Sequence, residues 1–221
     1  MANFLLILPV LLFSLVAHEF AHAWTAHREG DDTAWSQGRL TFNPLAHIDP
    51  FGTVLLPIML WVASSGTFTF GSARPVPVDP TKYRRPVRGD LIVSSAGIVM
   101  NLLLAVVFAG LYLALGLAAR SMSLDVIGTL QGMAGMGITI NILLAFFNLV
   151  PVPPLDGSHL LFHALPLSWR APYRRFGRFG FLLLILTLWL APSVWATVLW
   201  PASTLNDLAH GALRPWTIPG R

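Results

Sequence analysis

The sequence predicts an all-α polytopic membrane protein, and its composition is the first observation that supports this fold class. Of its 221 residues, 55% are hydrophobic and only 11% are charged, and the mean hydropathy is +0.66. A soluble domain carries about 25% charged residues, so this chain is too apolar to be one. The second observation is that the apolar residues gather in uncharged runs that are long enough to cross a bilayer. We expect about four full transmembrane helices in a single membrane-embedded domain, residues 1–221.

The first predicted span covers residues 4–26. Its roughly 23 residues, at about 1.5 Å each, are enough to cross the hydrocarbon core of a membrane. Residues 1–17 are uncharged, no basic stretch precedes them, and other long apolar runs follow, so we interpret the segment as a permanent helix and not as a cleaved signal peptide. Ala17 and Ala21 are small enough to let a neighbouring helix approach closely, which indicates a packed interface on this span.

Residues 27–89 have a different character, because they hold seven of the 14 lysines and arginines and many of the prolines and glycines. Within them, residues 51–65 are apolar, but the stretch is short and is broken by a glycine and a proline. It predicts a re-entrant or partly spanning segment. Residues 38–42 and 67–71 alternate in polarity and carry threonine and phenylalanine, so we expect a small membrane-associated β-hairpin there.

Three further uncharged runs are long enough to span, and the first and third include interfacial ends. They are Leu91–Ala119, Val126–Leu155 and Phe179–Asn206. The basic residues then orient the chain, since segments 27–89 and 157–178 hold seven and four of the 14, and the positive-inside rule places both in the cytoplasm. The two ends of the chain would then lie outside a cell membrane, provided that residues 51–65 return to the side from which they enter.

The absence of cysteine and the small net charge exclude several kinds of site and partner. The chain has no cysteine, which excludes disulfides, cysteine-ligated zinc and thiol nucleophiles. Its formal net charge is +4, and in a membrane protein this surplus reflects the loops and not an affinity for nucleic acid. Because the sequence has no RNA- or DNA-binding motif, we expect the lipid bilayer, and no nucleic acid, among the partners.

The end of the first span carries the residues from which chemistry can be predicted. Residues 18–22 read H-E-F-A-H, so His18 and His22 project from the same face of a helix, one turn apart. That is the spacing of two zinc ligands, and Glu19 is placed to act as a base on a water at the metal. Ionisable groups are costly at the end of a hydrophobic helix, which favours this interpretation over two ordinary interfacial histidines.

A catalytic zinc needs a third protein ligand, and Asp156 is the candidate. One zinc-protease pattern has a third histidine where this chain has Arg28, and Glu29 is too close in sequence to come from a second helix. Asp156 ends a long uncharged run, after three prolines that cannot continue a helix. The predicted topology brings it to the same side and depth as the two histidines. Alternatively, Asp156 only caps a helix that starts at Gly157, which a ligand role does not exclude.

Together with further motifs, these residues resemble the site-2 protease family, the intramembrane zinc metalloproteases of peptidase family M50. The matching segments follow the family's order through residues 18–157. They are His18–His22, Asn43–Gly52, Gly71–Val78, Ala96–Gly97 with Asn101, and Asn148–Gly157. Five motifs in one order are far more specific than any single motif.

The resemblance implies one zinc ion per chain, held by His18, His22 and Asp156, with Glu19 as the general base. The implied activity is the hydrolysis of peptide bonds within or near the transmembrane segments of membrane-protein substrates, as in regulated intramembrane proteolysis. The active site would face the cytoplasmic side of the membrane, and the substrate would be a protein with a transmembrane helix.

The resemblance also implies that Asn101 and Asn148 bind substrate near the scissile bond. The sequence departs from the family pattern at Ile98, where many relatives have proline, and this leaves the position of Asn101 open. The chain shows neither an inserted PDZ-type peptide-binding domain between residues 120 and 125 nor a CBS-type regulatory domain after residue 206. It resembles the minimal, core-only branch of the family.

A transmembrane metal carrier or channel is the alternative function, because a transit site could use the same His18, His22 and Asp156. Glu19 separates the two hypotheses, since transit needs no base between the ligands, whereas hydrolysis does. An inactive binding scaffold of the same fold is disfavoured, because the ligands and the base are all present.

Overall fold

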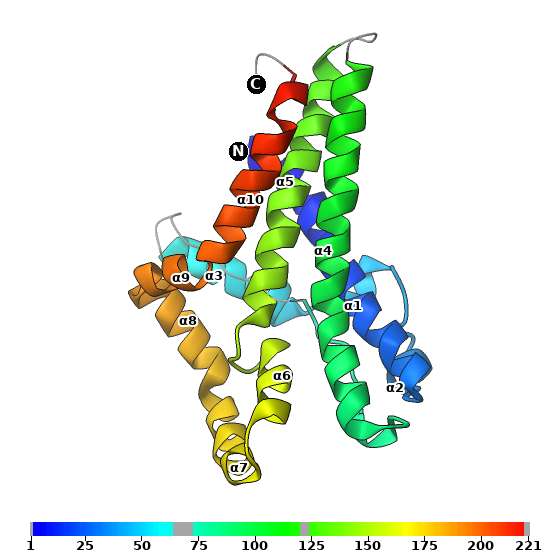
Figure 1. The fold of residues 1–221 in the computed structure, drawn as a ribbon, viewed down its shortest axis with the longest axis vertical. Helices are drawn as coiled ribbons and strands as arrows, with labels where there is room; N and C mark the ends of the chain where they lie inside the picture. The colour runs from blue at the N-terminus through cyan, green and yellow to red at the C-terminus, as the bar shows by residue number, and fades with distance from the viewer. Residues whose placement is uncertain (1, 64–72, 120–123, 219–221) are drawn as a thin grey trace.

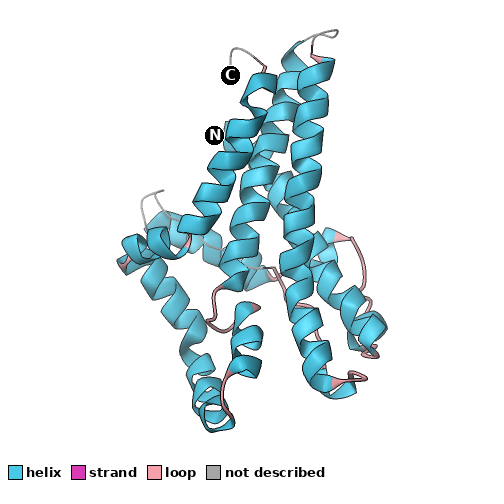
Figure 2. Cartoon of the chain, viewed as in Figure 1, coloured by secondary structure: helices cyan, strands magenta, loops and turns pink. Residues whose placement is uncertain are grey.

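All regular structure is helical in residues 2–63, 73–119 and 124–218, the parts of the chain that the computed structural model describes (Figures 1 and 2). Among the described residues, three helices are long and apolar enough to cross a membrane, and there are four spans if one strongly bent pair counts as a single span. The predicted all-α polytopic membrane protein is therefore confirmed, with three or four spans.

The three long helices form one bundle. They are α1 (Ala2–Glu29), α4 (Pro86–Ala118) and α5 (Leu124–Leu149). α4 and α5 run antiparallel, side by side, and α1 packs against both (Figure 1). Ala17 and Ala21 of α1 are only 2% and 5% exposed, which confirms that the small residues of this span lie in a packed helix interface.

The predicted span Phe179–Asn206 is not a single helix. The structure divides it into α8 (Gly180–Leu190), α9 (Pro192–Val198) and α10 (Trp200–Leu213), with a bend of 104° between α8 and α9. Pro192 and Pro201 stand in the first turns of α9 and α10, where a proline starts a helix but cannot continue the preceding one. α10 then packs along α5, so part of this apolar run covers the bundle.

The predicted β-hairpin is wrong for its first arm. Residues 38–42 form a turn, bends and loop, and no strand occurs within the described ranges (Figure 2). The chain turns here because Gly38 takes a left-handed φ of +67° and the Arg39 N–H donates back to a carbonyl of α2 (Thr33–Ser36) at 2.8 Å. The second arm, residues 67–71, lies outside the described residues.

The segment predicted to re-enter or partly span the membrane is helical from residue 50 to residue 63. It begins as a π-helix (Pro50–Leu55) and continues as α3 (Leu56–Ala63). Its 6 and 8 residues together fall short of the roughly 20 that a spanning helix needs, which supports partial insertion. The last two residues of the predicted segment lie outside the described ranges. Short 3₁₀ turns occur at Pro44–His47, Pro80–Lys82, Gly177–Phe179 and Arg214–Trp216.

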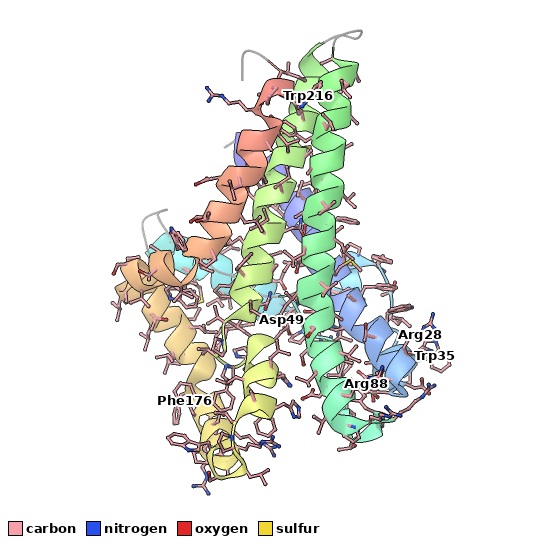
Figure 3. All side chains as sticks on the ribbon, viewed as in Figure 1. Arg28, Trp35, Asp49, Arg88, Phe176 and Trp216 are labelled. Atoms are coloured by element: carbon pink, nitrogen blue, oxygen red, sulfur yellow. The ribbon has the colours of Figure 1, made fainter. Side chains whose placement is uncertain are left out.

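The two ends of the bundle differ in charge. Figure 1 shows the two chain termini and the last turns of α4 at one end, and the start of α4, α6 (Gly157–Ala164) and α7 (Leu167–Phe176) at the other. Arg28 and Arg88 lie toward this second end, whereas Trp216 lies at the first (Figure 3). The two basic segments of the sequence thus share one end, as the predicted topology requires.

Candidate metal centre

The three side chains predicted to bind metal meet beside the second half of α1. His18 Nε2 lies 3.0 Å from His22 Nε2, and Asp156 Oδ2 lies 3.3 Å from each of these nitrogens. The centre is largely buried, since His18 is 6% exposed and the side chains of His22 and Asp156 are 11% and 18% exposed. Within the described residues, these are the three acidic or histidine side chains that converge closely enough to hold a metal ion.

This triangle of ligand atoms fits a zinc ion. A tetrahedral ion bound at about 2.0–2.1 Å separates its ligands by about 3.3–3.4 Å, close to the 3.0 and 3.3 Å sides observed here. His22 Nδ1 donates to the Val93 carbonyl at 2.7 Å, which leaves a lone pair on Nε2 of the neutral ring. Asp156 Oδ2 is buried and accepts no hydrogen bond from the described residues. Lone pairs that face one another without a donor repel, so the cluster has the chemistry of a cation site.

Residues on one face of α4 determine where both histidine side chains lie. Val93, Gly97 and Asn101 recur every four residues, so they lie on one face of the helix. The Val93 carbonyl holds His22, and Asn101 Oδ1 lies 2.6 Å from His18 Nδ1. At Gly97, between these two contacts, a Cβ would overlap both imidazole rings, so only glycine leaves room for them.

Asp156 reaches the histidines because α5 stops at Leu149. A loop with three prolines follows, and α6 starts at Gly157, where a Cβ would overlap the Leu149 carbonyl. Asp156 occupies the N-cap position of α6, as the capping alternative expects, but its side chain makes no capping hydrogen bond and is turned toward the histidines.

A second carboxylate, Asp90, ties α6 to the same face of α4. Asp90 is 8% exposed, and its oxygens lie 3.2 Å from His159 Nδ1 and 2.7 Å from His163 Nε2. The hydrogen bond to Asp90 raises the pKa of His159. Because α6 begins directly after Asp156, this contact also limits where Asp156 can lie. α4 therefore helps to position all three converging side chains. It contacts His18 and His22 directly, and it positions Asp156 through the contacts of Asp90 with α6.

Glu19, the predicted base, is half-buried on α1. Its Oε2 accepts a hydrogen bond from the Val76 N–H at 2.8 Å. The segment that carries Val76 is anchored by Arg39, whose guanidinium donates to the carbonyls of Arg74 and Pro75 at 2.8 and 3.3 Å. A main-chain donor thus orients one of the two carboxylate oxygens of Glu19.

The two asparagines predicted to bind substrate lie in different settings. Asn101 is fully buried, with its Oδ1 facing His18 and its Nδ2 donating to Asn141 at 2.8 Å, so its amide is committed inside the protein. Asn148 is half-buried at the end of α5, and its Nδ2 donates to the Leu144 carbonyl at 3.0 Å. The substrate-binding role stays a prediction for both residues, and this geometry supports it better for Asn148.

Sequence reasoning missed the groups that hold these side chains in place. Val93 and Val76 act through backbone atoms, which no side-chain pattern reveals. Asn141 and Asp90 did carry a signal, because one is an amide within an apolar run and the other is a carboxylate at the start of one. Such groups are costly in a membrane and are normally paired or functional.

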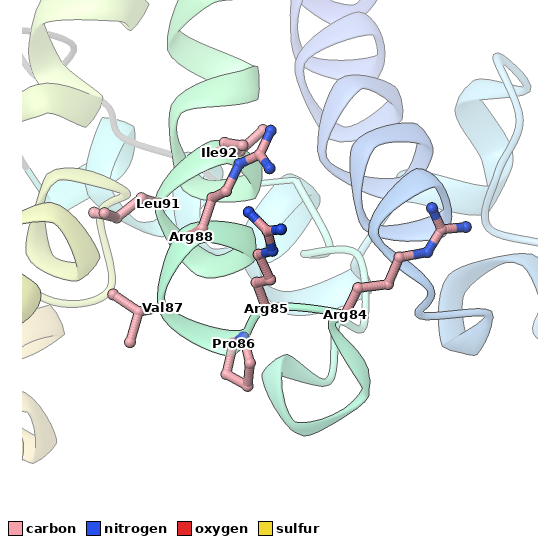
Figure 4. A pocket seen from close by; sticks show the side chains of 7 residues that line it. All are labelled: Arg84, Arg85, Pro86, Val87, Arg88, Leu91 and Ile92. Carbon is pink, nitrogen blue, oxygen red and sulfur yellow. The ribbon is translucent and has the colours of Figure 1, made fainter.

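A large groove lies elsewhere on the molecule. Its volume is about 840 Å³, and it opens around the first turns of α4 (Figure 4). It is lined by Arg84, Arg85, Pro86, Val87, Arg88, Leu91 and Ile92. None of the converging side chains belongs to this lining, and neither does Glu19, so the basic groove is not the candidate active site.

The fold and the site together define a class of protein. Two histidines and one aspartate are buried between helices of spanning length, which is the arrangement of an integral membrane metalloprotein. A glutamate next to the first histidine, in an H-E-x-x-H pattern on one helix, narrows the class to metal-dependent hydrolases.

Known proteins resemble this chain over most of its length. The family model described as Peptidase family M50 matches residues 6–123 and 117–191. A protein of Bacillus subtilis (strain 168) named "Putative zinc metalloprotease YwhC" is 39% identical over 193 residues, which are 86% of this chain and 82% of the relative. Proteins named "Putative zinc metalloprotease Rip2" from Mycolicibacterium smegmatis and Mycobacterium tuberculosis (strain H37Rv) are each 34% identical, over 83% and 86% of this chain and 68% and 69% of their own lengths. No solved structure is significantly similar.

The chain belongs to peptidase family M50, the site-2 protease family. It is a zinc metalloprotease and a multi-pass membrane protein, so the family, the enzyme class and the zinc cofactor that the motifs indicate are confirmed.

Proposed function

We propose that this metalloprotease cuts peptide bonds within or near the transmembrane segments of membrane-protein substrates, and that His18, His22 and Asp156 hold its zinc while Glu19 is the general base. The observation that carries the proposal is the convergence of three ligand atoms, 3.0–3.3 Å apart, among helices of spanning length. Two of these ligands belong to α1, which is itself long and apolar enough to span. That position supports chemistry at membrane depth.

His18, His22 and Asp156 would hold a zinc ion, which would supply Lewis acidity to activate a water molecule and polarise the scissile carbonyl. Glu19 takes the proton of this water on the carboxylate oxygen that Val76 does not engage, and later delivers it to the leaving amine. The hydrogen bonds to His18 Nδ1 and His22 Nδ1 keep both rings oriented while the proton moves. The chain's own contribution is therefore a set of ligands and a base that need little rearrangement during the reaction.

A transmembrane substrate must unwind locally before its backbone can reach this centre, because a membrane helix satisfies its backbone hydrogen bonds internally. Asn148 stands at the end of α5, one proline-rich loop before Asp156, and this position supports a role for its amide in holding an unwound strand. The burial of Asn101 supports a role behind His18 and not on the substrate.

The same proposal places the centre toward the cytoplasmic side of the cell membrane, in a single domain of residues 1–221. His18 and His22 lie in the half of α1 that leads to the basic end of the bundle, and the positive-inside rule assigns that end to the cytoplasm. A cut at this depth would separate the soluble part of a substrate from its anchor, as regulated intramembrane proteolysis requires.

Glu19→Gln tests the proposal in liposomes that carry a reporter with a transmembrane helix. Glutamine keeps an oxygen that can accept from Val76, but it cannot take a proton at neutral pH. We expect cleavage to fall at least about 100-fold, the low end of general-base assistance, while zinc content stays near about one ion per chain. Retention of more than about a tenth of the wild-type cleavage would refute the role of Glu19.

Two further results would change the proposed function. Cleavage of a soluble peptide, without cleavage of the membrane reporter that carries the same sequence, would refute the intramembrane substrate. If neither the wild type nor Glu19→Gln cleaves any peptide but both move zinc across the liposome membrane, the His18, His22 and Asp156 cluster belongs to a metal carrier instead.

A further inference from the structure

Behind His18, a chain of hydrogen bonds connects all three long helices. Asn101 of α4 has its Oδ1 2.6 Å from His18 Nδ1, and its Nδ2 donates to Asn141 Oδ1 of α5 at 2.8 Å. Asn141 Nδ2 donates in turn to Ser14 Oγ of α1 at 2.8 Å and to the Gly137 carbonyl at 2.9 Å. Asn101, Asn141 and Ser14 are all 0% exposed.

The direction of this chain is set at its far end. Ser14 Oγ donates to the Val10 carbonyl at 2.8 Å, so the hydroxyl can only accept from Asn141. The Gly137 carbonyl is also only an acceptor, so the part of Asn141 that faces both groups must be its NH₂. The oxygen of Asn141 therefore points at Asn101, and the NH₂ of Asn101 must turn toward it.

The orientation of the Asn101 amide determines which nitrogen of the proposed ligand His18 carries the proton. With its NH₂ turned to Asn141, Asn101 presents its oxygen to His18, and an oxygen acceptor requires a proton on His18 Nδ1. In the neutral ring, Nε2 then carries the lone pair. Nε2 is the atom that faces His22 and Asp156, so the hydrogen-bond chain selects the tautomer of His18 that can bind a cation.

His22 needs no such chain, because its Nδ1 donates to the Val93 carbonyl, which is an acceptor in any orientation. The amide of Asn101 is different, since it can turn over, and its NH₂ would then favour the tautomer of His18 that has its lone pair on Nδ1. We propose that Asn141 is a positioning residue of this zinc protease, which locks the amide of Asn101 and thereby sets the zinc-binding tautomer of His18. This inference rests on the proposed role of His18 as a ligand.

The composition of the bundle supports a specific role for Asn141. Polar side chains between membrane spans are costly, and an apolar residue would fill the same space without that cost. Here every polar atom of the Asn141 side chain is used, because the NH₂ has two acceptors and the oxygen has one donor. A fully satisfied amide at this point fixes an orientation, which packing alone does not do.

Asn141→Leu tests the inference, with zinc affinity measured by chelator competition on the purified protein in detergent. Leucine keeps the volume of the side chain but removes the oxygen that orients the Asn101 amide. We expect zinc to bind about 10–100-fold more weakly, which is the usual effect of losing the outer hydrogen-bond partner of a ligating histidine. Gln131→Leu is the matched control, since Gln131 is a buried amide of α5 that bonds to the carbonyls of Tyr112 and Trp216. This control should bind zinc within about twofold of the wild type.

Asn141→Asp keeps the test valid if the leucine variant does not fold. A carboxylic acid buried without a cation stays protonated, so its O–H can donate to Ser14 or Gly137 while its C=O accepts from Asn101. Zinc affinity should therefore stay within about threefold of the wild type, well above that of a variant without the lock. Ser14→Ala should weaken zinc binding less than Asn141→Leu, because the Gly137 carbonyl still orients Asn141. The inference would be overturned if Asn141→Asp and Ser14→Ala weakened zinc binding equally, each by more than about tenfold.

The tautomer itself is the second readout, and isotope-labelled histidine makes it visible by NMR in the zinc-free protein. The wild type should carry the His18 proton on Nδ1, and Asn141→Leu should shift the population toward Nε2. Weaker zinc binding with an unchanged tautomer would overturn the inference, because the effect would then come from packing.

His18→Ala separates this inference from the proposed function. If His18→Ala keeps its zinc, the ligand assignment is wrong. If His18→Ala loses zinc while a folded Asn141→Leu binds it within about twofold of the wild type, only the positioning role of Asn141 is wrong.

Discussion

The backbone N–H of Val76 donates to Oε2 of Glu19 at 2.8 Å. Val76 stands between Pro75 and Pro77, which have no N–H, so this stretch offers its main-chain donor at one position. Arg39 holds the same stretch through the carbonyls of Arg74 and Pro75. Pro75 and Pro77 thus have a physical reason, since between them only Val76 offers a main-chain donor to the proposed base.

Val76→Pro removes this donor without changing a charge. We expect kcat to fall at least about tenfold, because a hydrogen bond to a charged group is worth about 1.5–3 kcal/mol. Zinc content should not change, since the Val76 N–H bonds to Glu19 and not to a proposed ligand. Val76→Ala keeps the N–H and is the control, and its kcat should stay within about twofold of the wild type. An equal loss in both variants would mean that the side chain of Val76 matters and its N–H does not.

The contact between His159 and Asp90 makes stability depend on pH. The hydrogen bond to Asp90 raises the pKa of His159 above 6.5, so protonated His159 contributes stability that is fully present below that value and is lost as the pH rises through the folded pKa. His159→Gln keeps a hydrogen-bonding side chain but does not titrate. The wild type should therefore have a higher Tm than the variant near about pH 6, and the difference should shrink toward about pH 9. Thermal melts of both proteins in one detergent check this, and a difference that grows with pH contradicts it.

The parts that sequence reasoning predicted correctly follow from short-range rules. A helix brings residues four apart onto one face, so the meeting of His18 and His22 follows from spacing alone. The prolines before Asp156 cannot continue α5, so the chain turns there. This turn explains why the distant Asp156 could be predicted to meet His18 and His22.

The parts that it missed depend on tertiary contacts. An apolar run with prolines is compatible with a kinked span, because membrane helices tolerate proline, so residues 179–206 did not reveal their division into α8, α9 and α10. The alternation in residues 38–42 is too short to specify a strand, and its first residue, Gly38, lies in a turn. Asn141 was visible as a polar residue in an apolar run, but its partner on α4 is 40 residues away in sequence.

The predicted orientation in the membrane can be checked directly, because the chain has no cysteine of its own. Single cysteines in place of Arg84 and Arg174 should react with an impermeant reagent only from the cytoplasmic side, and one in place of Arg214 only from outside. Arg84 lies just before α4 and Arg174 lies in α7, whereas Arg214 directly follows α10. Figure 1 shows the start of α4 and α7 at one end of the bundle and the end of α10 at the other. The measurement is labelling of intact cells compared with inverted vesicles, and active enzyme in each variant is the control for folding. Labelling of positions 84 and 174 from opposite sides would show that the assumed orientation of the spans is wrong.

Gly97 gives the most direct test of how α4 frames the metal centre. A Cβ at this position would overlap the rings of both His18 and His22, whereas a Cβ at Gly110, on the same helix, meets no atom within 4 Å. We expect Gly97→Ala to weaken zinc binding at least about 100-fold, because it displaces two ligands and not only one outer contact. Gly110→Ala should keep full zinc affinity and gain about 0.5–1 kcal/mol of helix stability. Zinc titration and thermal melts of the two variants check both expectations together. If Gly97→Ala binds zinc as tightly as Gly110→Ala, then α4 does not lie against the two histidines, and the framing of the site by this helix is wrong.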